Sequence, residues 1–229
     1  MAHYLIVGGT RGIGAGLATQ LIDQGHEVVI WARNRVDLPG AQVFVNNPAE
    51  TVPDLTGLPA VLDGLIYCPG SINLKPFARL TQEDFLQDFQ TNVLGAVRTM
   101  QSVAPLLKKS EQASVVLFSS VAASLGMPFH ASIASSKAAI EGLVKSVAAE
   151  WAPSIRVNAI APSLTNTSLA EKLLNSADKI DAAAKRHPLQ KLGSPEDIAA
   201  MAAFLLSPQA GWITGQIVHI DGGMSALKT

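Results

Sequence analysis

Short apolar segments alternate with longer amphipathic ones along most of this 229-residue chain. Apolar residues recur three and four positions apart at Phe85, Phe89, Val93, Val97 and Met100, and this spacing predicts an amphipathic helix. The short segments are rich in Val, Ile, Leu and aromatic residues, which is typical of buried strands. They are Tyr4–Val7, Glu27–Trp31, Val43–Val45, Leu62–Tyr67, Ser114–Phe118, Ile155–Ile160 and Gln216–Ile220. Strands that alternate with helices predict a parallel sheet with helices on both faces.

Residues that start and stop helices support the same interpretation. Gly25 follows the first helical segment as a stop signal, and Thr81 with Asp84 forms a capping-box pattern. The segment 194–197 places a serine cap, a first-turn proline and two acidic residues at the start of another helix. We therefore expect an α/β fold with a Rossmann-type, doubly wound, seven-stranded parallel sheet, formed by residues 1–229 as a single domain.

Two segments depart from the regular alternation. Residues 47–60 are too short and too rich in proline and glycine for a full crossover helix, so we expect a loop there. Residues 163–193 form a long, partly polar segment after the sixth strand, in the position of a lid over a site at the sheet edge.

Composition narrows the function classes. Hydrophobic residues make up 48% of the chain and charged residues 15%, with a formal net charge of -1 and no long basic run, so neither nucleic acid nor an anionic membrane is an expected partner. Cys68 is the only cysteine, and no apolar run reaches the length of a membrane span. These features predict a soluble, cytoplasmic protein that acts on small molecules, without a metal site.

A glycine-rich turn joins the first predicted strand to the first predicted helix. Gly8, Gly12 and Gly14 have the spacing for a tight turn, for close approach of the backbone to a pyrophosphate, and for close packing of helix on strand. The helix N-terminus behind them attracts phosphate through its free N–H groups and its dipole. The sequence therefore predicts a dinucleotide site at this turn.

The end of the second strand indicates which dinucleotide binds. Sites that prefer NAD usually carry an acidic residue there, whereas the additional phosphate of NADP needs positive charge. Here the stretch is 31–34, Trp-Ala-Arg-Asn, which has no acid and places Arg33 just past the strand. Arg11 in the glycine turn is a second candidate, because planar guanidinium groups engage two phosphate oxygens at once. NADP(H) is the predicted cofactor.

Separated motifs over nearly the whole chain resemble the short-chain dehydrogenase/reductase family. The glycine turn resembles the family's T-G-x-x-x-G-x-G, with Val7 in place of threonine. The family's N-N-A-G is replaced by Tyr67-Cys68-Pro69-Gly70, and the usual proline-glycine after the sixth strand is Pro162-Ser163. The other matching segments are Asp63–Ile66, Thr91–Val93, Ser119–Ser120, Arg156–Asn158, Ile213–Gly215 and Asp221–Gly223.

The resemblance implies hydride transfer between nicotinamide and a carbonyl or alcohol, carried out by Asn, Ser, Tyr and Lys. By their place in the motifs, Asn92 would anchor a proton-relay water, Ser120 would hold the substrate oxygen, and Lys137 would bind the nicotinamide ribose. The implied cofactor-binding residues are Gly8, Thr10, Arg11, Gly12, Ile13, Gly14, Arg33, Asn34, Asn46, Pro69, Gly70, Lys137, Pro162, Leu164 and Thr167.

The family's tyrosine has no counterpart here. Four residues before Lys137, and thirteen after Ser120, the chain has Ile133, which cannot donate a proton. General acid catalysis contributes about a hundred- to ten-thousand-fold and needs a titratable group. His130, one helical turn earlier, is the nearest candidate, although a histidine at that position is also typical of a capping or packing residue.

Two functions remain open from the sequence. One is an NADP(H)-dependent oxidoreductase that delivers hydride to a carbonyl or a conjugated double bond, with a proton from His130 or from water. The other is a catalytically inactive NADP(H)-binding protein that acts as a sensor or scaffold. Family members are usually dimers or tetramers, and Trp212 and the Ala-rich face near Ala138 and Ala139 are compatible with a homo-oligomer.

Overall fold

The computed structural model describes residues 1–228 and contains one seven-stranded sheet in the order β3-β2-β1-β4-β5-β6-β7. Every pair of neighbouring strands is parallel. The predicted Rossmann-type fold class is therefore confirmed. The strands are β1 (His3–Val7), β2 (Glu27–Ala32), β3 (Ala41–Val45), β4 (Gly64–Tyr67), β5 (Ala113–Phe118), β6 (Ile155–Pro162) and β7 (Ile217–Ile220).

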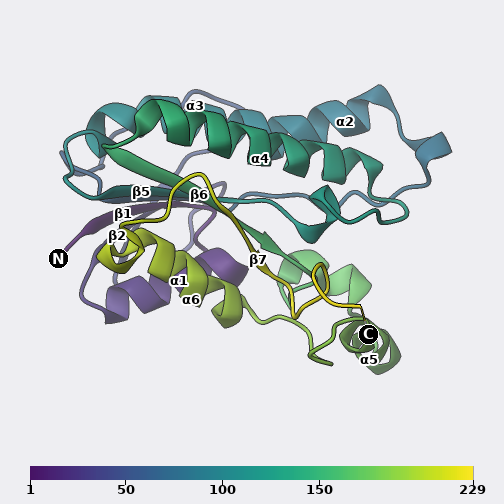
Figure 1. The fold of residues 1–229 in the computed structure, drawn as a ribbon. Coiled ribbons are helices and arrows are strands. Elements are labelled where there is room, and N and C mark those ends of the chain that lie inside the picture. Colours follow the sequence, from purple (N-terminus) through teal and green to yellow (C-terminus); the bar gives the residue numbers. More distant parts are fainter. Residues whose placement is uncertain (229) are drawn as a thin grey trace.

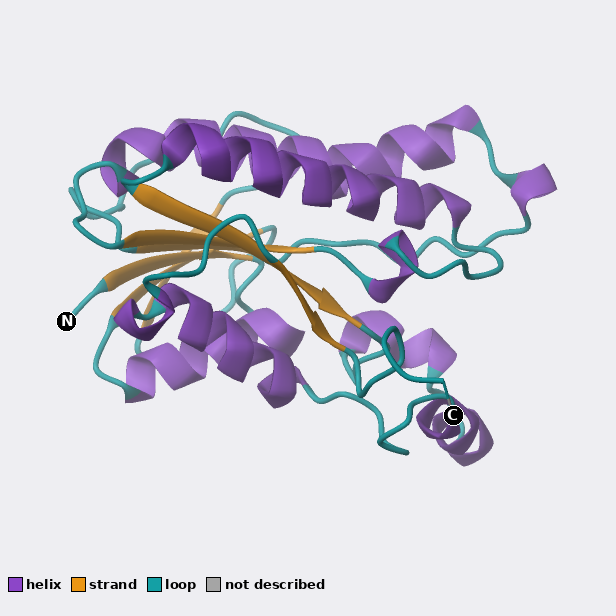
Figure 2. Cartoon of the chain, viewed as in Figure 1, coloured by secondary structure: helices purple, strands orange, loops and turns teal. Residues whose placement is uncertain are grey.

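Helices cover both faces of the sheet (Figures 1 and 2). On one face lie α1 (Gly12–Asp23) and α6 (Pro195–Leu206), and on the other lie α2 (Gln82–Phe89), α3 (Gly95–Leu107) and α4 (Ala131–Trp151). The helix α5 (Ala177–Lys185) lies beyond the end of the sheet, beside the C-terminal residues. The predicted loop is confirmed, since the chain between β3 and β4 contains no helix.

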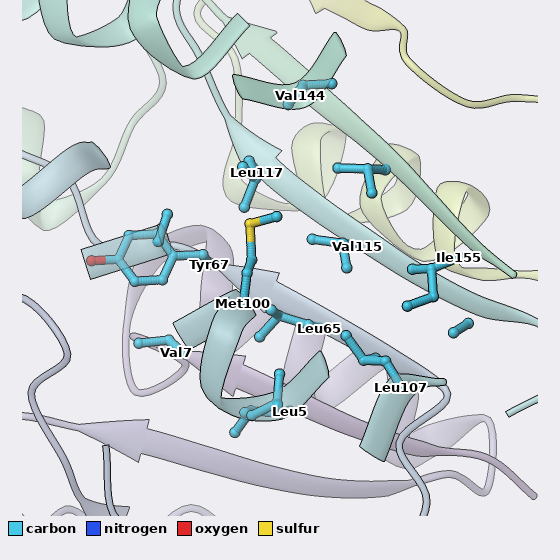
Figure 3. Packing of buried hydrophobic residues seen from close by; sticks show 14 of the residues in the cluster. Leu5, Val7, Leu65, Tyr67, Met100, Leu107, Val115, Leu117, Val144 and Ile155 are labelled. Atoms are coloured by element: carbon cyan, nitrogen blue, oxygen red, sulfur yellow. The ribbon is translucent and has the colours of Figure 1, made fainter. Parts of the chain in front are cut away.

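The alternation of side chains along the strands produces two apolar layers. Leu5 and Val7 of β1 face α3 and α4, whereas Tyr4 and Ile6 face α1 and α6. Figure 3 shows Met100 of α3 pointing into the first of these layers, among residues of the central strands. Helices that pack on both faces keep the central strands in fixed positions, so the loops at the carboxyl ends of these strands start from fixed positions as well.

The helix predicted from the spacing of Phe85 to Met100 is not continuous α-helix. A π-helical turn, Gln90–Leu94, separates α2 from α3. The hydroxyl of Tyr67 donates a hydrogen bond to the carbonyl oxygen of Thr91 (2.7 Å), and only a glycine fits at position 95, where a Cβ would lie 1.9 Å from that hydroxyl oxygen. Insertions of this kind occur frequently at functional sites, and this one contains Asn92.

The predicted helix caps are present. Thr81 with Asp84, and Ser194 with Asp197, each form both hydrogen bonds of a capping box. Predicted strand limits differ from the structure by one or two residues. The largest functional consequence is at β6, which continues to Pro162 and so carries residue 163 to the sheet edge.

Candidate active site

The glycine-rich turn lies at the carboxyl edge of the sheet, where β1 stands between β2 and β4 and the order of strands reverses. Ligands of open α/β sheets bind at such a switch point. Gly8 and Gly12 have positive φ angles of 77° and 55°, which L side chains rarely adopt. A Cβ on Gly14 would lie 2.5 Å from the carbonyl oxygen of Gly8, so the helix packs against the turn only because position 14 is glycine.

The N-terminus of α1 has the features of an anion site. Arg11 at the N-cap makes no side-chain cap hydrogen bond, and the first turn contains no acidic residue. The first amide groups of the helix and its positive dipole end are therefore available to a phosphate. Pro69 packs against Gly8, and Thr167 lies 3.5 Å from the space that a Cβ on Gly12 would fill, so two further predicted cofactor residues gather at the turn.

The residues predicted to hold the adenosine end of the cofactor lie in the glycine turn and around the ends of β2 and β3. Arg11, Arg33 and Asn34 are exposed, and within residues 1–228 neither arginine forms a salt bridge. Thr10 is half-buried in the glycine turn. Asn46 is buried, and its amide nitrogen donates to the carbonyl oxygen of Asp54 (2.8 Å), so its side chain also fixes the loop after β3.

A cavity of about 450 Å³ opens next to the glycine turn. Its walls come from the ends of β4, β5 and β6, the start of α4, and the segment 163–193. Ile133 lies in the same cavity. Many of the residues predicted for catalysis or for nicotinamide binding line it together: Ile13, Gly70, Ser120, His130, Lys137, Pro162, Leu164 and Thr167.

Lys137 and Ser120 provide the polar groups at the inner end of this cavity. The Lys137 ammonium donates to the carbonyl oxygen of Phe118 (2.8 Å), and burial lowers the pKa of Lys137 to about 8, while the charge of Asp88 acts in the opposite direction. Ser120 Oγ accepts a hydrogen bond from the backbone N–H of Ala122 (3.2 Å). No acceptor within residues 1–228 takes the Ser120 hydroxyl hydrogen, which leaves that hydrogen for a substrate oxygen.

Asn92 does not line the cavity directly but belongs to a buried polar cluster behind it. Its amide nitrogen donates to Ser71 Oγ (3.0 Å) and to the carbonyl oxygen of Asp88 (2.8 Å), and Ser71 donates to the Asp88 carboxylate (2.6 Å). Ser132 of α4 donates to the other carboxylate oxygen. Among the described residues Asn92 Oδ1 is buried without a partner, which fits an oxygen that binds a water.

His130 and Ile133 occupy consecutive turns at the start of α4. His130 is the N-cap residue but makes no side-chain cap bond, and its Nδ1 lies 2.7 Å from the carbonyl oxygen of Pro128. The capping function that the sequence left open is therefore absent, and the ring lines the cavity mouth. Ile133 is buried, one turn before Lys137 on the same helix face.

The structure adds a pair of residues that the sequence did not reveal. His187 is buried, with Nδ1 2.9 Å from the carbonyl oxygen of Ala183 and Nε2 2.9 Å from Ser163 Oγ, and both His187 and Ser163 line the cavity. The serine in place of glycine after Pro162 was the only sequence signal. The histidine lies 24 positions further on, and only the path of α5 brings it back to the sheet edge.

Cys68 and Tyr67 do not add reactive groups to the site. Burial raises the pKa of the Cys68 thiol to about 12, so it remains a neutral thiol packed against the apolar layer beside α1 and α6. Burial also raises the pKa of Tyr67, which packs in the opposite layer with its hydroxyl bound to Thr91.

Comparisons with known proteins agree with this geometry. Residues 47–225 match a family model described as enoyl-(acyl carrier protein) reductase. A tropinone reductase homologue of Datura stramonium is 33% identical over 241 residues, covering 96% of this chain and 90% of that protein. The chain belongs to the short-chain dehydrogenase/reductase family, whose members bind nicotinamide cofactors and act on small molecules.

Solved structures show the same architecture. Aldohexose dehydrogenase of Thermoplasma acidophilum, in ligand-free form, is 26% identical with a TM-score of 0.89, and the match covers 100% of this chain and 96% of that chain. ElxO with NADP bound is 27% identical with a TM-score of 0.89, covering 99% and 100%. No helix in the part of the chain described here is long and apolar enough to cross a membrane.

Proposed function

We propose that this protein is an NADP(H)-dependent oxidoreductase that transfers hydride to a carbonyl group or a conjugated double bond of a small molecule. The observation that carries the proposal is the convergence of Lys137 and Ser120 in one cavity, immediately beside an uncapped, glycine-rich helix N-terminus. A binding protein without chemistry would need the turn and the lysine, but it would not need a serine hydroxyl whose hydrogen is directed to no protein acceptor.

The choice of NADP(H) rests on charge at the ends of β1 and β2. Arg11 and Arg33 are exposed and unpaired within the described residues, and residues 31–34 at the end of β2 include no acid that could hold the ribose hydroxyls of NAD. That ElxO has been solved with NADP bound supports the same choice. Lys137 and the segment 162–167 would hold the nicotinamide half, because they line the cavity and Thr167 of this segment lies beside Gly12 of the glycine turn.

The bound cofactor would supply the hydride. The side chains of this protein then have to hold the substrate and manage charge. Ser120 would donate its hydroxyl hydrogen to the substrate oxygen, and the Lys137 ammonium would stabilise the negative charge that develops there. Asn92, held by the cluster around Asp88, would keep a water in reach through its free Oδ1.

The proton has to come from a group other than residue 133. Two histidines line the cavity among the described residues, His130 at the start of α4 and His187 just after α5. His187 is the better placed, because the carbonyl of Ala183 accepts from Nδ1 and Nε2 lies against Ser163 in the cavity wall. In its imidazolium form His187 would give the Nε2 proton to Ser163 Oγ while the Ser163 hydroxyl gives its own proton to the substrate, and the neutral imidazole would later take up a proton from solvent. A conjugated double bond would need this donor least, since solvent can protonate carbon afterwards.

The segment 163–193 acts as the lid in this proposal. It supplies one complete wall of the cavity, including Leu164, Thr167, Leu169 and Leu173. Trp212 is fully exposed, with 100% of its surface accessible, and we propose that it lies in the interface of a homodimer or homotetramer.

A screen of NADPH oxidation with ketones, diketones and enones tests the proposed activity. The unmodified protein is expected to turn over at least one of these classes, and Ser120→Ala to reduce its kcat by about a hundredfold, the usual effect of removing one oxyanion donor. Ser135→Ala is the matched control, because Ser135 lies on the exposed side of α4 and bonds only to Ala131. NADPH binding without oxidation of any compound would favour the sensor or scaffold function.

A further inference from the structure

One face of α5, continued by Arg186 and His187 just after its last residue, forms a wall of the cavity. Lys179, Ala182, Ala183, Arg186 and His187 all line it. Their spacing of three, four, seven and eight positions is that of a single helical face. The wall therefore carries a cation at each end, with small apolar residues between them. Seven residues of helix separate the two cationic positions by roughly 10 Å along the axis.

Charges on α5 are sorted between the two faces of the helix. Asp178 and Asp181 do not line the cavity, and Asp181 forms an ion pair with Lys185 (2.6 Å). Lys179 donates to the amide oxygen of Asn175 (2.8 Å). Within residues 1–228, Arg186 has no carboxylate or other acceptor for its guanidinium group. The acidic residues of this helix are therefore not in the cavity wall, and no carboxylate of the helix neutralises the positive charges of Lys179 and Arg186 there.

The rest of the cavity extends this charge asymmetry. No aspartate or glutamate is among the described residues that line the cavity. Three basic residues line it: Lys137, Lys179 and Arg186. The remaining wall is largely apolar: Ile72, Leu74, Met127, Leu164, Leu169, Leu173 and Met224. A cavity with an apolar body and a few placed polar groups binds a ligand of matching chemistry, and an unpaired guanidinium is suited to carboxylate or phosphate oxygens.

We propose that the substrate is an amphipathic anion: a carbonyl or enoyl compound with an apolar body and a carboxylate or phosphate group that Arg186 binds, assisted by Lys179. The inference rests on the proposed function, since it names the substrate class of that same cavity. Ser120, which follows β5, and Lys137 of α4 would act on the reducible group, and Lys179 and Arg186 would hold the anionic group from the part of the wall that α5 and its C-cap form.

In the proposed function the cofactor does not need these cations. Its pyrophosphate would be held by the N-terminus of α1 and its 2′-phosphate by Arg11 and Arg33, none of which belongs to α5. If the cofactor nevertheless uses Arg186, then Arg186→Gln weakens NADPH binding, which is measurable independently of any substrate.

Isothermal titration of the NADPH-saturated protein with octanoate, octan-1-ol and octylammonium tests the proposal. Octan-1-ol and octylammonium share one apolar chain, and the alkyl chain of octanoate is one methylene shorter, so tighter binding of octanoate has to come from its head group. Octanoate is expected to bind at least tenfold more tightly than octan-1-ol, or about 1.4 kcal/mol, with octylammonium the weakest. Arg186→Gln removes most of this difference. Lys185→Gln, on the outer face of the same helix, leaves it unchanged.

Equal affinities for octanoate and octan-1-ol would overturn the proposal, as would an equal loss in Arg186→Gln and Lys185→Gln. A parallel loss of NADPH affinity in Arg186→Gln would also overturn it, because the arginine would then serve the cofactor. NADPH titration of the unmodified protein tests the proposed function separately. If NADPH does not bind, that function fails, and the same three titrations on the free protein still measure the charge preference of the cavity.

Discussion

Replacing His187 with glutamine is expected to lower the kcat of NADPH-dependent reduction by about a hundredfold while leaving NADPH affinity unchanged. The glutamine amide is able to bond both Ala183 and Ser163, as the imidazole does, so the local structure is retained. What the variant lacks is a ring nitrogen that can take up and give up a proton. Stopped-flow measurement of NADPH oxidation, with the binding isotherm alongside, separates the rate from the affinity.

His130→Gln is the companion variant. His130 lines the same cavity but is only half-buried, whereas His187 is buried. An unchanged rate in His130→Gln with a large loss in His187→Gln assigns proton supply to the buried pair. The reverse result would assign it to the residue predicted from sequence. Unchanged rates in both variants would exclude both histidines and leave water as the proton source.

Ile133→Tyr is expected to raise carbonyl reductase activity with NADPH and a generic ketone by about tenfold or more, if proton supply limits the unmodified protein. Position 133 is buried one helical turn before Lys137, and the cavity beside it opens toward Ser120. A phenol at position 133 would lie next to the Lys137 ammonium, and this positive charge would lower the pKa of the phenol. Burial lowers the pKa of Lys137 to about 8, so the ammonium is present at pH 7 and is lost as the pH rises through about 8. The gain in activity should therefore be largest near pH 7.

Ile133→Phe is the control for this gain, since it adds the ring without the hydroxyl. An equal increase in both variants would mean that ring packing, and not proton donation, changed the rate. If Ile133→Tyr binds NADPH normally but reduces no substrate, Asn92, Ser120 and Lys137 act in cofactor binding only, and the sensor or scaffold function becomes the better account.

Local signals in the sequence were sufficient for the fold. The inner strands β1, β2 and β4 are continuous apolar runs because they are buried on both faces. The caps at Thr81 and Ser194 depend on residues three positions apart. The sequence did not reveal the π-helical turn at Asn92, because one inserted residue leaves the apolar spacing of the helix nearly unchanged. The contacts at this turn, from the Tyr67 hydroxyl to Thr91 and Gly95, join residues far apart in the chain.

The site divides in the same way. Residues in short motifs, such as Gly12, Ser120 and Lys137, were predictable because one strand end or one helix start positions each of them. Asp88, Ser163 and His187 were not, because their significance comes from contacts between elements. The cationic face of α5 has helical spacing in the sequence, but only the folded chain shows that this face, and not the acidic one, turns to the cavity.

Fluorescence titration of the unmodified protein with NADPH and with NADH tests the central claim most directly. NADPH is expected to bind at least tenfold more tightly, about 1.4 kcal/mol, because Arg33 and Arg11 are unpaired where the 2′-phosphate would lie, and Arg33→Ala should remove most of the difference. Equal affinities for the two cofactors, or no binding of either, would contradict the account.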